Sequence, residues 1–145
     1  SFDPNLGAGS EIGTGEETLL TYQIKSKGFR LVAAFNTAVE HHCAEERLLK
    51  MSYLRAAARI GRSEAYIDYH WRGTPVKPLC LYFGLIRRYA LLVWKRISRF
   101  SEIRTPEGIF PWEFQLQMQI YYRWQLLSEW GSDRKYVTKV DSVDC

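Results

Sequence analysis

The chain has 145 residues, 46% of them hydrophobic, which is enough for one domain with a buried core. Twenty basic residues against sixteen acidic ones give a net charge of +4, too modest to define a function by itself. Three cysteines, an odd number without Cys-x-x-Cys spacing, argue against a disulfide framework and favour a reducing compartment.

The first residues predict a flexible, acidic arm. Residues 1–16 hold four glycines and few large apolar side chains, and no apolar run typical of a signal peptide. We expect a single globular domain over residues 17–145. It begins with a strand at residues 20–25, where apolar and polar side chains alternate, and Gly28 ends that strand.

A long helical pattern follows. Apolar residues recur at three- and four-residue spacing over residues 29–60, which predicts a helix with a break near residues 41–46. Gly61 is the expected stop signal. Alternation over residues 65–71 predicts a second strand, and two prolines within residues 73–78 predict a loop.

The clearest helix pattern covers residues 79–100 and the clearest strand pattern residues 114–120, with a Pro/Gly loop between them. Residues 136–140 fit one more short strand. We therefore predict an α+β fold, in which an antiparallel sheet is packed on one side by two or three helices.

The predicted helix 79–100 has an apolar face and a basic face. We expect the apolar face to lie on the core and the basic face, with Arg88, Lys95 and Arg99, to point outward. The candidate binding residues are Arg87, Arg88, Lys95, Arg96, Arg99 and Arg104. Three interpretations stay open: a solvated stripe, a contact with nucleic-acid phosphates, or a contact with an anionic membrane surface.

Large aromatic side chains are the second notable feature. The chain has five tryptophans, nine tyrosines and seven phenylalanines, too many for all of them to be fully buried. Trp112, Trp124 and Trp130 lie near predicted loops or beyond a predicted strand. They are candidate anchors of a protein interface, although they also fit a role in covering the open face of the sheet.

Sequence signatures of catalysis are missing. The chain has no Gly-x-Ser-x-Gly, phosphate-loop or His-Glu-x-x-His motif. His41, His42 and Cys43 are adjacent, and neighbours on a helix point about 100° apart, so they do not converge on one metal. A zinc site would have to combine His42, Cys43 and Cys80, which fit better as core residues. We expect no enzyme, no cofactor and no metal.

Three segments resemble the matrix proteins of rhabdoviruses. Residues 21–30 resemble that family's first core strand running into its first helix. Residues 65–71 with 79–85 resemble its middle segment, and residues 112–120 resemble its long central strand. Together they cover about a third of the chain. Unlike the family's usual N-terminal segment, residues 1–16 are acidic and have neither a lysine-rich stretch nor a proline-rich budding motif.

The resemblance implies a non-enzymatic structural protein of the virion and of the infected cell's cytoplasm. Such a protein associates with itself, binds nucleocapsid or RNA, contacts the inner membrane surface and drives budding. The alternative is a small viral accessory protein that binds RNA or a host protein. A small hydrolase or metal enzyme is the third hypothesis.

Overall fold

The fold is all-α. A computed structural model describes residues 3–33, 38, 40, 44–100 and 108–136 of the chain. Within these residues 64% are helical, and none forms a strand beyond a single bridge residue at Leu49. The prediction of an α+β fold with an antiparallel sheet is therefore wrong, and the chain forms a single-domain helical bundle.

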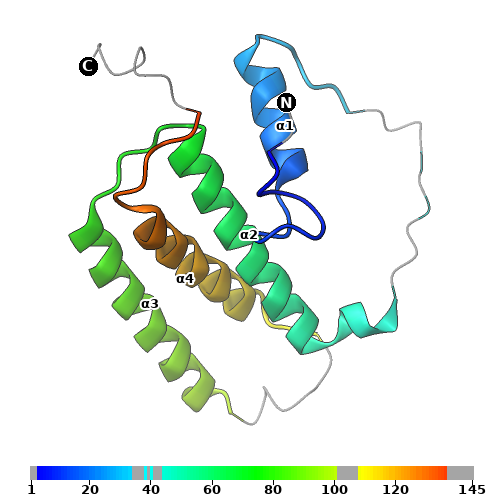
Figure 1. Cartoon of the computed structure of the whole chain (residues 1–145). Coiled ribbons are helices and arrows are strands. Elements are labelled where there is room, and N and C mark those ends of the chain that lie inside the picture. Colours follow the sequence, from blue (N-terminus) through cyan, green and yellow to red (C-terminus); the bar gives the residue numbers. More distant parts are fainter. Residues whose placement is uncertain (1–2, 34–37, 39, 41–43, 101–107, 137–145) are drawn as a thin grey trace.

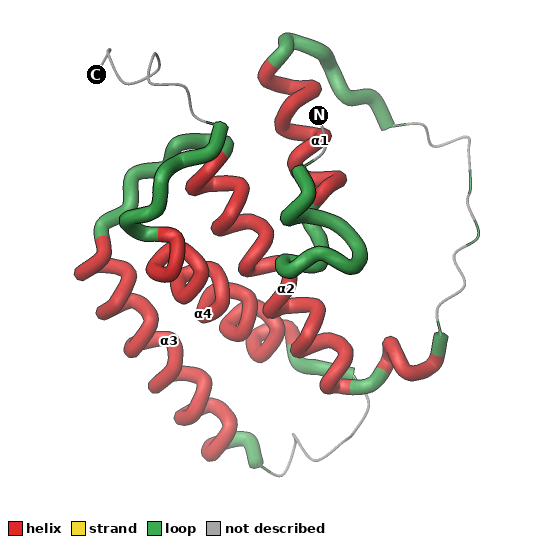
Figure 2. The backbone as a smooth tube through the Cα atoms, in the orientation of Figure 1, coloured by secondary structure: helices red, strands yellow, loops and turns green. Residues whose placement is uncertain are grey.

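Four α-helices and one short 3₁₀-helix make up this part of the chain (Figure 1 and Figure 2). They are α1 (Glu16–Ser26), η1 (Glu45–Leu48), α2 (Lys50–His70), α3 (Pro78–Ser98) and α4 (Pro111–Glu129). Both α3 and α4 begin with proline, whose fixed φ and missing N–H suit the first helical position. In space, α4 lies between α2 and α3 and packs against both (Figure 1).

The strand predicted at residues 114–120 is part of α4, because this helix is buried on two opposite sides. Residues two apart on a helix point about 200° apart, so an alternating pattern places apolar groups on both sides. Leu116 and Ile120 pack with Leu92 of α3. The backbone of Met118 meets α2 on the other side.

The strand predicted at residues 65–71 is wrong for the same reason. Residues 65–70 form the end of α2, which is also covered from two sides. Ala65 and Tyr69 pack with Leu126 of α4, whereas Ile67 packs with apolar residues of the N-terminal segment.

The strand predicted at residues 20–25 is not found, and the one predicted at residues 136–140 falls almost entirely outside the described residues. Residues 20–25 lie within α1, which buries only Leu19. The short alternation of apolar and polar residues there does not correspond to a buried and an exposed face of a sheet. Tyr136 is not in a strand, and residues 137–140 lie outside the described residues.

Of the long helix predicted at residues 29–60, the part from Lys50 onward is found, and Gly61 does not end it. Residues 34–37, 39 and 41–43 lie outside the described residues. Residues 29–33 are irregular. Gly61 lies in the middle of α2, where a Cβ atom would overlap the carbonyl oxygen of Met118 on α4. Ala57 and Ala65, one turn away on either side, are also buried, so a row of small residues lets the two helix backbones approach closely.

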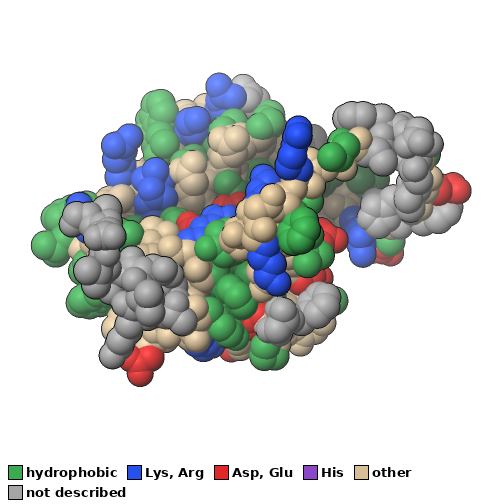
Figure 3. Space-filling model, turned by 90° about the horizontal axis from the view of Figure 1, so that it is seen from above, with side chains coloured by type: hydrophobic (Ala, Val, Ile, Leu, Met, Phe, Trp, Pro, Cys, Tyr) green, Lys and Arg blue, Asp and Glu red, His purple; other side chains and the backbone are tan. Residues whose placement is uncertain are grey.

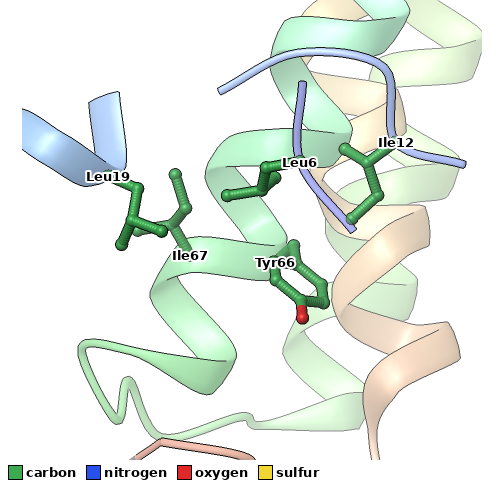
Figure 4. Packing of buried hydrophobic residues seen from close by; sticks show 5 residues of the cluster. All are labelled: Leu6, Ile12, Leu19, Tyr66 and Ile67. Atoms are coloured by element: carbon green, nitrogen blue, oxygen red, sulfur yellow. The ribbon is translucent and has the colours of Figure 1, made fainter. Parts of the chain in front are cut away.

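The N-terminal segment is packed onto α2 rather than extended from it. Leu6 and Ile12, from the region predicted to be an arm, are buried with Leu19 of α1 against Tyr66 and Ile67 (Figure 4). This cluster forms one side of the core and fixes the start of the chain on the end of α2.

Candidate interaction surface

The helix predicted at residues 79–100 is confirmed as α3, but the face that it turns toward the core is the opposite of the predicted one. Of its 21 residues only Leu92 is buried. The apolar face predicted to lie on the core points away from α4 to the outside of the molecule. The prediction of an outward basic side is therefore wrong for Arg88 and Lys95, whose side chains contact α4, whereas Arg99 is exposed.

We define the outer face of α3 by its exposed apolar side chains. They are Leu79, Tyr82, Phe83, Ile86, Tyr89, Ala90, Val93, Trp94 and Ile97, with Phe100 just beyond the helix. The nine large ones are between 48% and 74% exposed. At 3.6 residues per turn these residues share a sector of about 140° that contains no charged residue. In Figure 3, hydrophobic side chains gather at the left edge of the molecule, the side on which Figure 1 places α3.

Arg88 is turned into the contact with α4. Its Nε donates a hydrogen bond to Oε1 of Gln119 at 2.6 Å, and its Nη1 donates to the carbonyl oxygen of Gly84 at 3.3 Å. Burial lowers the pKa of the Arg88 guanidinium, and the nearby charge of Arg87 lowers it further. Arg88 is therefore a packing residue rather than a free phosphate ligand.

Arg96 and Lys95 are also engaged inside the protein. Nε and Nη2 of Arg96 donate to Oε1 of Glu113 at 2.9 and 2.7 Å, and Lys95 Nζ lies over the ring of Trp112, 5.3 Å from its centre. Of the remaining candidates, Arg87 and Arg99 are exposed, and Arg104 lies outside the described residues. The basic residues thus do not form one outward row.

Glu113 of α4 is the acidic partner of Arg96, and the sequence pattern did not indicate it. Its side chain is fully buried, and Lys50 Nζ lies 3.1 Å from its Oε2. Together with Arg96 it joins the starts of α2 and α4 to the end of α3. The available signal was that Glu113 is the only acidic residue in the sequence from Gly108 to Ser128.

The three candidate tryptophans lie in different environments. Trp112 is half-buried beside Leu92 and Leu116, and its Nε1 is buried without a hydrogen-bond partner. Trp130 is exposed beyond the end of α4. Only Trp124 adjoins the outer face of α3. It lines a groove of about 290 Å³ between α3 and α4 together with Leu85, Tyr89, Gln117, Ile120 and Tyr121.

A polar cluster at the end of α2 is the other candidate site. His70 is almost completely buried. Its Nε2 lies 3.2 Å from Oε2 of Glu129, and its Nδ1 accepts the backbone N–H of Lys135 at 3.3 Å. Burial lowers the pKa of His70, against the opposing effect of Glu129. With both ring nitrogens bonded, His70 has no free position for acid–base chemistry.

Asp3 belongs to the same cluster and has a structural role. Its carboxylate accepts hydrogen bonds from Asn5, from Tyr66 Oη at 3.0 Å and from Trp71 Nε1 at 3.1 Å. Burial by itself would raise the pKa of Asp3, but these donors together lower it. Lys135 Nζ lies over the ring of Tyr66, so the cluster ties both ends of the described chain to α2.

The described residues hold no group of three side chains able to bind a metal ion. His42 and Cys43 lie outside them, and Cys80 is exposed rather than in the core. Among the helices in the described part of the chain, none combines the length and apolar character needed to cross a membrane.

Comparisons of the chain with protein-family models, with curated proteins and with solved structures return no match. The three segments that resemble rhabdovirus matrix proteins are helical or irregular here. The strands that the resemblance implied at the start of residues 21–30 and at residues 112–120 are therefore wrong. A function for the candidate surface therefore has to be inferred from the geometry of the surface itself.

Proposed function

We propose that this protein is a non-enzymatic assembly protein that associates through the outer face of α3. The observation that supports this function is a complete helix face of large apolar side chains left outside the core. A self-associating role is also what the matrix-type hypothesis expects of the chain.

The size of the face fits a protein interface. A large side chain offers on the order of 200 Å², so nine of them at these exposures present roughly 1,000 Å². Monomeric proteins seldom expose apolar patches above a few hundred Å². A stable complex typically buries about 800 Å² on each partner. The outer face of α3 is thus large enough to form one interface without help from other elements.

The chemistry of the face favours protein over RNA or lipid. Interface cores are rich in aromatic residues and poor in charge, as this face is. RNA binding would need free basic side chains, and Arg88 and Arg96 are hydrogen-bonded within the protein. An interfacial membrane helix usually has several basic residues that flank its apolar face and are available to lipid, whereas Arg88, Lys95 and Arg96 all contact side chains of α4.

Sedimentation velocity over a concentration series tests this function. We expect the wild-type chain to associate, and a Phe83→Glu/Ile97→Glu double variant to remain at its monomer mass of 17.0 kDa. Burial of an unpaired carboxylate costs several kcal/mol, so association should weaken by at least about 100-fold. The matched control is Leu20→Glu/Met51→Glu, which places the same charges on exposed apolar residues of α1 and α2.

Two results would contradict the proposal: a wild-type chain that stays at 17.0 kDa throughout, or an outer-face variant that associates as the wild type does. A parallel flotation with anionic vesicles separates the membrane alternative. If the wild type binds vesicles as a monomer and the outer-face variant does not, the face docks on lipid.

A further inference from the structure

We infer that the partner of the outer face of α3 is the same face of a second copy, with the two α3 helices antiparallel and Ala90 on the two-fold axis. This inference rests on the proposed function and deepens it by naming the partner and its orientation. Three features of α3 support it: the position of its smallest outer residue, the distribution of its charges and the self-matching order of its large side chains.

Ala90 marks the point where two helices can approach most closely. It lies near the middle of α3, which covers Pro78–Ser98, and it is the only small side chain on the outer face. Phe83 and Ile86 precede it, and Trp94 and Ile97 follow it, at similar separations. A crossing centred on Ala90 therefore has large side chains on both sides of a narrow centre, as ridge-and-groove packing requires.

The charges of α3 favour the antiparallel orientation. Residues 78–86 contain no charged residue, and residues 87–98 contain four basic residues, Arg87, Arg88, Lys95 and Arg96, with no acid. Parallel packing would place the two basic halves side by side. Antiparallel packing places each basic half beside the uncharged half of the other copy, and it also opposes the two helix dipoles.

The axis fixes which residues meet. An antiparallel pair centred on Ala90 places Phe83 beside Ile97 of the second copy, and Ile86 beside Trp94 of the second copy. The contact is isologous, because the same surface is used on both copies, and it closes as a dimer. Any larger assembly must then use surfaces other than α3.

Cysteine cross-linking in the full chain tests the arrangement, with Cys43, Cys80 and Cys145 replaced by serine. Ala90→Cys should form a disulfide-linked dimer rapidly on mild oxidation, because helices in contact at 8–10 Å bring such positions within disulfide reach. Phe83→Cys is the matched control. In the antiparallel pair its two copies lie about 20 Å apart, given a rise of 1.5 Å per residue, and should not cross-link. An equimolar mixture of the Phe83→Cys and Ile97→Cys chains should cross-link as a heterodimer.

The outcomes separate this inference from the proposed function. Sedimentation of the reduced variants reports association independently of the disulfide. A dimer that cross-links through Phe83→Cys, with or without Ala90→Cys, or through neither single cysteine, overturns the antiparallel arrangement and leaves the docking face intact. A chain that remains monomeric and does not cross-link overturns both.

Discussion

Helices α2 and α3 have the same length, 21 residues, and opposite relations to the core. α2 buries eight residues, some against α4, such as Gly61 and Tyr69, and others under the N-terminal segment, such as Ile67. α3 buries one residue, and its largest side chains face outward. The comparison shows that an amphipathic pattern defines two faces of a helix without deciding which of them the fold covers.

The largest expected effect is a difference in stability between substitutions at Gly61 of α2 and Gly84 of α3. Gly61→Val should destabilise the fold by about 3 kcal/mol or more, because the new side chain overlaps the backbone of α4 at Met118. Gly84→Ala on α3 is the matched control. Its Cβ would meet only the ends of flexible side chains, those of Arg123 and Arg88, and alanine has the higher helix propensity. Stability should therefore stay within about 1 kcal/mol. Urea unfolding measures both. An equal loss of stability in the two variants would contradict the conclusion that α2 is closely packed on α4 and that α3 is not.

The next effect concerns the buried carboxylate that holds the basic side of α3 inward. Glu113→Gln should lower stability by about 1–3 kcal/mol, because it removes a charge-assisted bond to Arg96 and the ion pair with Lys50. The loss stays moderate because the side chain of Arg96 is 42% exposed and can be rehydrated. Glu17→Gln, at an exposed acid of α1, should change stability by less than about 0.5 kcal/mol. Equal urea midpoints for Glu113→Gln and the wild type would show that Glu113 is not needed.

The smallest effect is the pH dependence at the end of α2. Burial, opposed by Glu129, lowers the pKa of His70 below its ordinary 6.5. The unfolded chain therefore takes up a proton more readily than the folded one. The stability from neutral His70 is complete above about pH 6.5 and is lost as the pH falls through the folded pKa, by at most about 1.4 kcal/mol per pH unit.

A His70→Gln variant isolates this contribution, because the two proteins are otherwise identical in sequence. Urea midpoints measured from pH 7.5 to 5.0 should fall less steeply in the variant. Parallel curves for the two proteins would mean that His70 does not lose stability on protonation.

Helix α3 could be predicted from the sequence to within two residues at each end. The sequence pattern of α4 and of the end of α2 could not be distinguished from that of a strand. Both helices are buried on two opposite sides, so apolar residues occur at every second position, as they do in a strand. The close approach at Gly61 had a visible signal, small residues four positions apart at Ala57, Gly61 and Ala65. The orientation of α3 had no visible signal in the sequence. It depends on hydrogen bonds that the arginines of α3 donate to Gln119 and Glu113 of α4.

The central claim is that the outer face of α3 is covered when the chain associates. Oxidative labelling of the full wild-type chain at rising concentration tests it directly, with Phe83, Trp94 and Ile97 as the reporters and Trp130, exposed beyond α4, as the internal control. We predict that labelling of the three reporters falls as the molar mass rises, while labelling of Trp130 stays constant. Reporters that remain fully labelled after the mass has doubled would contradict this account.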